Sequence, residues 1–469
     1  MLHSSSRDSR SAFVFLLFPV ILVVAVALLY QLIVQEKTMI LFATIAALFF
    51  IICFSSIRIS LVLLIFSMLL SPEIEVAQTV KREVTVRFDD LLLFIMTISW
   101  LVRMALFSDL GVILKNPLNK PIILYSSVAV VSTVLGTMYG QVNPLAGTFF
   151  VLKMIEYFFL FTIIVNYVRE EEHIHQLLSV MLIVFGIICL YGVVMILTGG
   201  DVSAPFEGEE AERNTLGGYL VLMASVAAGV MISTPSRMER ILIASFLPVF
   251  FAVLLFSISR SGWVSGIAAL IVLFFFTKKK GCFFTVILIV FLIFPFIMPD
   301  VVEERVSYTF AQNAHFGGQI QIGPFLLDTS TSARLFSYKI VLEQVFKHPF
   351  FGYGITGFGF VDGQYFRVLI EMGIIGLGAL IWLLAGVHNM IRKGLKKMQS
   401  PRLHGMAVGF YAGFWGMVMH ALSANTFIIV RIAEPFWCLA GLIVAYYHLT
   451  PAESNLHVSE ETEESSVQK

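Results

Sequence analysis

Two arginines have the type and position that could do chemistry in this chain. Arg260 stands alone between two long apolar runs, and Arg334 lies in a long loop between apolar runs. A guanidinium group presents a planar fork of N–H donors that matches the oxygens of a phosphate. The sequence therefore predicts that both arginines bind an anionic group. The alternative for Arg260 is a snorkelling arginine that ends a helix at the lipid headgroups. The alternative for Arg334 is an ion pair with a loop carboxylate, Asp328 or Glu304.

The residues around Arg334 predict an amphipathic helix over Arg334–Lys347. From Lys339 onward, charged residues recur at i, i+4 and i+8, which is the spacing of one helical stripe. Arg334 shares the opposite stripe with Tyr338 and Val341. A charge on the face that packs inward is costly unless it is paired. Arg334 is therefore expected to face the membrane-embedded part of the protein, where it binds an anion or a carboxylate.

A glycine-rich segment and an aspartate follow this helix. The segment His348–Gly359 has four glycines in its last eight residues, which permits close approach of the backbone. It lacks the Gly-Lys-Ser/Thr ending of a nucleotide-binding P-loop. Asp362 then precedes the next apolar run, where it can cap the helix or accept a proton as a general base. These two roles are compatible.

Further polar residues lie near the ends of apolar runs. Arg367 and Glu371 are four residues apart and predict an ion pair on one helix face. Lys153 and Glu156, three residues apart, are a second such pair. Ionisable residues inside spans are functional candidates by default. The remaining polar candidates expected on the same face are Arg213, Asn214, His420, Arg431 and Glu434.

The elements that must position these residues are membrane helices. Hydrophobic residues make up 58% of the 469-residue chain and charged residues 13%, whereas soluble domains are about a quarter charged. Apolar stretches of about 17–25 residues, long enough to cross a bilayer, recur along the chain. The composition predicts an all-α polytopic membrane protein with about 12–14 transmembrane helices and one long extracytoplasmic loop that contains amphipathic helices. A formal net charge of zero gives no reason to expect a nucleic acid partner, and the four cysteines lack the spacing of disulfide frameworks or metal sites.

We place fourteen spans along the sequence. They are at 12–34, 38–54, 57–71, 88–107, 121–140, 147–168, 173–198, 215–233, 239–257, 261–277, 281–298, 363–391, 403–422 and 427–448. The chain then divides into N-terminal spans (1–198), spans with the Arg260 hairpin (199–298), an extracytoplasmic loop (299–362), C-terminal spans (363–448) and an acidic tail (449–469).

Basic residues set the expected orientation of the chain. Lys278–Lys280, the pair Arg237 and Arg240, and the basic loop 392–402 lie two spans apart from one another. The positive-inside rule places all three in the cytoplasm. The loop 299–362, and with it the candidate residues, is then outside, and with fourteen spans both termini are cytoplasmic.

Four segments together resemble the bacterial superfamily of O-antigen ligases and O-antigen or exopolysaccharide polymerases. They are Arg-Asn-Thr-Leu-Gly-Gly-Tyr at 213–219, Ser-Arg-Ser-Gly-Trp at 259–263, Arg334 with a helix and His-Pro-Phe-Phe-Gly-Tyr-Gly at 348–354, and Asp-Gly-Gln-Tyr-Phe with Glu-Met-Gly-Ile-Ile-Gly-Leu at 362–377. The resemblance covers about residues 200–445. It implies a membrane glycosyltransferase of the GT-C type that uses a glycan on undecaprenyl diphosphate, without metal or nucleotide sugar. Arg260 and Arg334 would then hold the diphosphate leaving group, whose negative charge grows as it departs.

The chain departs from the family pattern at one position. Ligases of the family usually carry His-Asn where this chain has Asp362-Gly363, and that histidine is their proposed base. The departure favours a polymerase over a ligase that acts on lipid A-core. Asp362 can replace the histidine as the base, and His348 and His315 are the alternatives.

The residues and the resemblance together predict a polymerase that joins undecaprenyl-diphosphate-linked repeat units into an O-antigen, exopolysaccharide or teichuronic-acid-like chain at the outer face of the bacterial plasma membrane. One rival is a ligase that transfers finished glycan to a lipid, peptidoglycan or protein acceptor. The other is a transporter or flippase for a lipid-linked oligosaccharide. Transporters tend to show repeats and interrupted helices, and the sequence shows neither plainly.

The predicted site follows from these arguments. The candidate catalytic residues are Asp362, Arg260 and Arg334, and the candidate substrate-binding residues are Arg260, Arg334, Arg213, Asn214, Gln364, Tyr365, Glu371 and His348. The expected partners are the lipid-linked donor, a glycan or lipid acceptor and the membrane, with a chain-length regulator or flippase as a further candidate.

Overall fold

The computed structural model of the chain describes residues 48–78, 83–106, 114–206, 213–277, 280–281, 319–322 and 325–449. These residues divide into two compact units, of which the second begins at Leu114. The predicted span at 12–34, most of the spans at 38–54 and 281–298, and the acidic tail lie outside the described residues.

In the described residues of the first unit, a hairpin lies between two helices. The helices are α3 (Ile57–Leu70) and α4 (Phe88–Leu106), and the antiparallel strands β1 (Glu73–Gln78) and β2 (Glu83–Arg87) connect them. A buried ion pair between Arg87 and Asp89 fixes the corner where β2 continues into α4. Ser71, which follows α3, donates to the same carboxylate at 2.6 Å. Both helices coincide with predicted spans.

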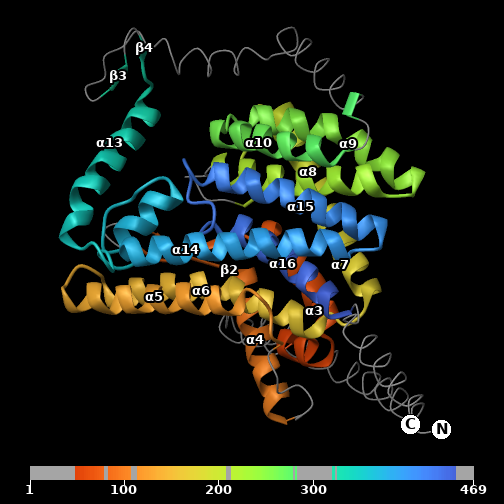
Figure 1. Cartoon of the computed structure of the whole chain (residues 1–469), viewed down its shortest axis with the longest axis horizontal. Coiled ribbons are helices and arrows are strands. Elements are labelled where there is room, and N and C mark those ends of the chain that lie inside the picture. The colour runs from red at the N-terminus through yellow and green to blue at the C-terminus, as the bar shows by residue number, and fades with distance from the viewer. Residues whose placement is uncertain are drawn as a thin grey trace, which may run out of the picture. The chain divides into compact units, whose positions relative to one another are not determined.

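The second unit is a helix bundle with one short hairpin (Figure 1). Its elements are α5 (Asn119–Met138), α6 (Pro144–Tyr167), α7 (Glu171–Thr198), α8 (Arg213–Ser233), α9 (Arg237–Phe256), α10 (Arg260–Phe276), β3 (Gln321–Ile322), β4 (Phe325–Leu326), α13 (Thr329–Gln344), the 3₁₀ turn η2 (Val345–Lys347), α14 (Gln364–Lys397), α15 (Pro401–His420) and α16 (Val430–Leu449). Each span predicted from residue 121 on, except 281–298, coincides with one of these helices. Seven helices among the described residues are long and apolar enough to cross a membrane, which confirms the all-α membrane fold.

Helices α8 and α16 form the centre of the bundle, and small residues bring α8 and α15 together. Most residues of α8 and α16 are buried, whereas α7 and α9 have wide exposed apolar faces. A Cβ atom at Gly229 of α8 would overlap the carbonyl oxygen of Gly405 and would lie 2.5 Å from the backbone nitrogen of Gly409, both in α15. Glycine at these positions therefore allows the two backbones to approach closely, as is common between membrane helices.

The predicted amphipathic helix exists as α13 and begins five residues earlier than expected. Asp328 caps it by accepting a hydrogen bond from the backbone N–H of Thr331. The predicted stripes are confirmed, because Val341 is buried while Lys339 and Glu343 are exposed. Figure 1 shows α13 at one end of the bundle, at a steep angle to α14.

Helix α14 is interrupted, which corrects the view that the chain has no broken span. Gly373 has φ 68° and ψ −168°, far from helical values. The glycine-rich segment after α13 fills the break with its backbone. Tyr353 N–H donates to Ile370 O at 2.9 Å, and Ile374 N–H donates to Pro349 O at 2.8 Å. The backbone groups freed by the break are thus satisfied inside the protein, as a membrane-embedded segment requires.

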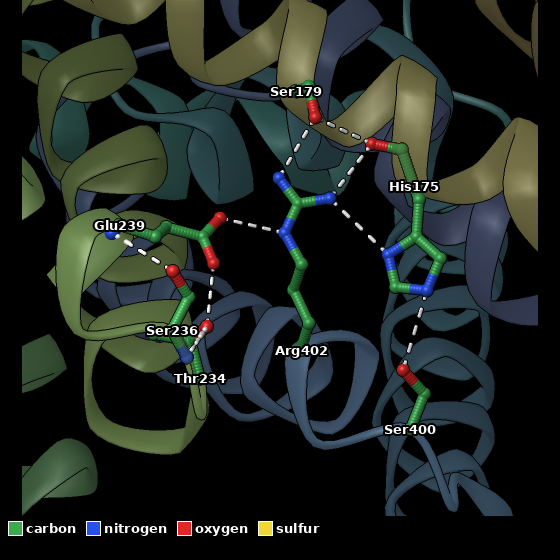
Figure 2. A network of polar contacts seen from close by, with 7 residues as sticks. All are labelled: His175, Ser179, Thr234, Ser236, Glu239, Ser400 and Arg402. Carbon is green, nitrogen blue, oxygen red and sulfur yellow. Dashed lines mark hydrogen bonds and ion pairs between the residues drawn. The ribbon is translucent and has the colours of Figure 1, made fainter.

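At the other end of the bundle, a polar network around Arg402 joins α7, α9 and α15 (Figure 2). Arg402 donates through Nε to Glu239 at 2.7 Å, through Nη1 to the carbonyl oxygen of His175 at 3.0 Å, and through Nη2 to Ser179 at 2.9 Å. Glu239 accepts a further hydrogen bond from Thr234 at 2.6 Å. We call this the Arg402 end of the bundle, and the opposite end, where α10 and α14 begin, the Arg260 end.

Candidate functional site

Arg260 lies in a tight turn between α9 and α10. The turn places Ile258 at φ 53°, a left-handed conformation that is rare and strained for a β-branched residue. Ser259 then caps α10 by accepting from the N–H of Gly262 at 3.1 Å. Arg260, the first residue of α10, reaches Asp328 with Nη2 at 2.8 Å. The strained turn thus delivers the guanidinium group to the N-terminus of α13.

Asp328 is buried and charged. Burial raises the pKa of this carboxyl, but the hydrogen bond and positive charge of Arg260 and the hydrogen bonds from Thr331 lower it, and the net pKa lies below the ordinary value of 3.8. A buried carboxylate needs such partners. Asp328 therefore has two tasks: it caps α13 and pairs with Arg260.

Arg334 makes an ion pair with Asp362. Its Nε lies 3.0 Å from Oδ2 of that carboxylate, and the side chains are 19% and 29% exposed. The two terminal nitrogens of the Arg334 guanidinium, Nη1 and Nη2, make no hydrogen bond within the described part of the chain. The structure thus shows the ion pair predicted as the alternative for Arg334, but with a different acid. Asp328 pairs with Arg260 instead, and Glu304 lies outside the described residues.

Asp362 does not cap α14, so the capping interpretation is wrong. The cap position is Gly363, at φ 91°, and no side chain bonds the first turn there. A Cβ atom at Gly363 would lie 2.7 Å from Oη of Tyr338 and 2.9 Å from the carbonyl oxygen of Leu422. Glycine is required because α13 and the turn after α15 close in on the start of α14. The Asp362 carboxylate is therefore directed to Arg334.

Two ion pairs attach α13 to the bundle, and the arginine comes from the bundle in one pair and from α13 in the other. Arg260 of the bundle binds Asp328 of α13, and Arg334 of α13 binds Asp362 of the bundle. Tyr338 adds a hydrogen bond from its hydroxyl to the carbonyl oxygen of Leu422 at 2.8 Å. Three of the four segments that carry the family resemblance thus meet at α13.

The fourth segment, at the start of α8, joins them through Asn214. Its Oδ1 accepts from the hydroxyl of Ser259 at 3.0 Å, and Gly217 lies against the same serine. Arg213 pairs with Asp201 at 3.0 Å, and both side chains are largely exposed. Asn214 is therefore adjacent to the Arg260 turn, while Arg213 lies on the surface beside it.

The other predicted site residues have structural contacts. Gln364 is buried at the start of α14, and Tyr365 donates its hydroxyl to Val418 O at 2.9 Å. Glu371 lies beside the break in α14, where it pairs with Arg367 at 3.3 Å, as predicted, and accepts from a backbone N–H of the glycine-rich segment. Both side chains of this pair are buried.

His348 lies with the turn between α5 and α6 and not with the ion pairs. Its Nε2 is 3.1 Å from Gln141, and its ring packs near Tyr139 and Tyr353. The second alternative base, His315, lies outside the described residues. Among the described residues the structure thus brings Arg260, Arg334 and Asp362 to α13 and leaves His348 elsewhere.

The remaining candidates differ in their surroundings. The Lys153 ammonium lies 5.6 Å from the ring centre of Phe149. Arg431 is buried and donates to the carbonyl oxygen of Pro205 at 2.5 Å. In the described part of the chain, no group of three or more His, Cys, Asp and Glu side chains has an arrangement that could hold a metal ion.

Sequence reasoning missed the turn between α15 and α16. Ser423 donates to Ser261, next to Arg260, at 2.8 Å. Ala421 and Ala424 accept hydrogen bonds from the backbone N–H of Gln364 at 2.9 and 3.1 Å. The turn thus touches both the Arg260 segment and the Asp362 segment. Its small and polar residues gave no signal above that of an ordinary loop.

The fold and this end of the bundle define a multi-pass helical membrane protein with paired charges at one end of its helices. Residues 243–381, from α9 to the middle of α14, match the family model described as O-antigen ligase. The match supports the predicted resemblance to the O-antigen ligase and polymerase superfamily over this part of the chain, and with it a glycan-transferring function of that type. No curated protein matches the chain.

Proposed function

We propose that the protein is a polymerase that joins glycan repeat units linked to a polyprenyl diphosphate, at the outer face of the bacterial plasma membrane. The observation that carries this proposal is the placement of Arg260 and Arg334 at one end of the bundle, each held by one carboxylate. In Arg334 the two terminal nitrogens remain available for phosphate oxygens. The donor diphosphate would share or displace the carboxylates that pair with the arginines.

Asp362 is the proposed general base. It takes the proton of an acceptor sugar hydroxyl while that oxygen bonds to the anomeric carbon of the donor. The bond from the anomeric carbon to the phosphate oxygen breaks, and the diphosphate leaves with the electron pair. The growing charge on the diphosphate meets the two guanidinium groups. The 3.0 Å contact between Asp362 and Arg334 supports a base beside the leaving group.

A ligase remains the nearest rival, and Asp362 argues against it. Where the family's ligases usually have a histidine, this chain has a carboxylate that pairs with Arg334. A gene deletion separates the two functions through the size of the surface glycans. Loss of long chains while single repeats persist supports the polymerase, and accumulation of lipid-linked polymer supports the ligase.

A transporter of lipid-linked oligosaccharide is the second candidate, because α14 is interrupted at Gly373. In transporters the freed ends of such half-helices bind the cargo. Here the glycine-rich segment already occupies them, which favours the transferase. Purified protein in liposomes with lipid-linked repeat units distinguishes the two: a transferase lengthens the glycan, whereas a transporter moves it unchanged.

The orientation is part of the proposal, with the Arg260 end outside and both termini in the cytoplasm. It rests on the basic loops at the Arg402 end. Single substitutions Glu343→Cys and Lys396→Cys, both at exposed positions, can be probed with an impermeant thiol reagent after any outer envelope is removed. We expect labelling of Glu343→Cys alone, with the unsubstituted protein as the control for native cysteines. Labelling of Lys396→Cys alone would reverse the orientation.

A further inference from the structure

Three buried side chains beside the proposed site each have one polar atom bound and one polar atom without a partner. Gln364 accepts from the backbone N–H of Phe427 through Oε1 at 3.0 Å, and Asn425 donates through Nδ2 to Val361 O at 3.0 Å. His420 contacts Thr426 through Nδ1 at 2.8 Å. The atoms without a partner are Gln364 Nε2, Asn425 Oδ1 and His420 Nε2. A buried polar atom without a partner is costly, so three in one place require an explanation.

The hydrogen bonds that each side chain already makes determine whether its atom without a partner is a donor or an acceptor. Because Gln364 accepts from a backbone N–H and Asn425 donates to a backbone carbonyl, neither amide can be flipped. Gln364 therefore presents a donor and Asn425 an acceptor. In the tautomer of His420 that donates from Nδ1 to the Thr426 hydroxyl, Nε2 presents a lone pair. The set is uncharged, with one donor and two acceptors, and suits hydroxyl groups, which donate and accept, better than an anion.

These side chains come from two short segments that meet directly below α13. The backbone N–H of Gln364 bonds Ala421 and Ala424, so the start of α14 rests on the turn that follows His420. Tyr338 of α13 contacts this turn through its hydrogen bond to the carbonyl oxygen of Leu422, and its ring stacks on Phe366 with the ring centres 4.0 Å apart. The cluster is thus adjacent to Asp362, the partner of Arg334.

We propose that Gln364, Asn425 and His420 form a hydroxyl-binding subsite for the acceptor sugar. The inference rests on the proposed function and specifies where the acceptor binds: the arginines hold the charged donor, and this uncharged cluster holds the sugar that attacks it. Because the two ion pairs attach α13 to the bundle beside these buried side chains, a donor diphosphate that draws the arginines from their carboxylates releases α13 and opens the subsite. Acceptor binding then follows donor binding.

The test uses two nearly isosteric variants of the full-length protein in liposomes. Gln364→Glu keeps the oxygen that binds Phe427 and replaces the donor without a partner. His420→Asn keeps a polar group near the Nδ1 position and removes Nε2. The acceptor is the free oligosaccharide released by mild acid from the lipid-linked repeat units of cells that produce the protein. We expect each variant to raise the KM for this acceptor about tenfold or more, with the KM for the lipid-linked donor unchanged.

Trp437→Phe is the matched control. Its indole nitrogen is also buried without a partner, but it lies in the aromatic cluster of α16 with Phe158 and Phe161. This variant should change neither KM. If Gln364→Glu and His420→Asn behave like Trp437→Phe, or only raise the thermal midpoint, the proposal is wrong. The three polar atoms would then be buried without a binding role or would contact internal water.

Direct binding separates this inference from the proposed function. The shift of the thermal midpoint on addition of the same oligosaccharide is measured in the presence of undecaprenyl diphosphate. A shift in the unsubstituted protein and in Trp437→Phe that is lost in the two variants supports the subsite, even if no polymer forms. Polymer formation with equal shifts in all four proteins refutes the subsite and leaves the polymerase standing.

Discussion

Arg402 and Arg334 lie at opposite ends of one helix bundle and are held in different ways. Arg402 uses all three guanidinium nitrogens on its own chain, with Glu239, His175 and Ser179 as partners (Figure 2). Arg334 uses Nε alone, on Asp362. Both side chains are 19% exposed, so burial does not separate them. The two arginines differ in how many of their guanidinium nitrogens are hydrogen-bonded to the protein itself.

This comparison suggests a rule for reading charges in membrane proteins. An arginine whose donors are all satisfied by its own chain has nothing left to offer a ligand, and its removal costs folding energy. An arginine with a free edge at the end of a bundle can bind an anion in a bidentate manner. Arg260 lies between these cases, because the carboxylate with which it pairs, Asp328, is also the cap of α13.

Asp362→Asn should reduce polymer formation by about 10²–10⁴-fold, which is the usual contribution of a general base. Asparagine keeps an oxygen that can accept from Arg334 Nε but cannot take a proton at neutral pH. Polymer formation in liposomes measures the effect, and Glu343→Gln, on the exposed stripe of α13, is the control. Near-normal polymer formation by Asp362→Asn would show that the carboxylate only positions Arg334.

Arg334→Ala should reduce turnover by about 10²–10³-fold through loss of an anion-stabilising donor. Arg334→Lys should restore little of it, since an ammonium group cannot form the bidentate contact. The thermal midpoint in detergent should hardly change, because one partly exposed ion pair contributes about 0–1 kcal/mol. Lys339→Ala, on the same helix, is the control for α13 itself. Full activity of Arg334→Ala would leave only the ion-pair interpretation.

The sequence was sufficient to predict features that depend on neighbours along the chain. Hydropathy located the helices, and the four-residue spacing predicted the pair Arg367 and Glu371. The family motifs indicated Arg260 and Arg334, but not their partners. Those partners are 68 and 28 residues away, and many acids along the chain are equally eligible until the fold selects among them.

The break in α14 and the contacts of Asp362 show why other features of the fold and the site could not be predicted from the sequence. Glycine is common in membrane helices, so Gly373 looks ordinary until the glycine-rich segment is seen to fill the gap beside it. Asp362 precedes a helix, and aspartate is a favoured cap. Tertiary contacts override this preference, because Tyr338 and Leu422 leave room only for glycine at the cap position.

Arg402→Ala should have the reverse profile to Arg334→Ala. Loss of its hydrogen bonds to Glu239, His175 and Ser179 should cost about 1.5–3 kcal/mol of stability, since bonds of charged groups are the stronger ones. The thermal midpoint and the folded yield should fall, while activity per folded molecule stays normal. Arg237→Ala, an exposed arginine at the same end, controls for loss of positive charge. If Arg402→Ala kept its stability but lost most of its activity, the distinction between a structural Arg402 end and a functional Arg260 end would be wrong.

Arg213 should give the smallest effect and the finest test. It makes an ion pair with Asp201, and the side chains of Arg213 and Asp201 are 42% and 82% exposed. Such a pair contributes less than about 1 kcal/mol, so Arg213→Ala should leave the thermal midpoint unchanged. If Arg213 attracts the anionic donor, the KM for the donor should rise a few-fold at low salt, and the rise should vanish near 1 M salt, where charges are screened beyond about 3 Å. Asp201→Asn breaks the same ion pair but keeps the arginine, so it should leave the KM unchanged or lower it. An equal rise in KM in both variants would mean that the ion pair itself matters, and Arg213 would then belong with Arg402 among the structural arginines.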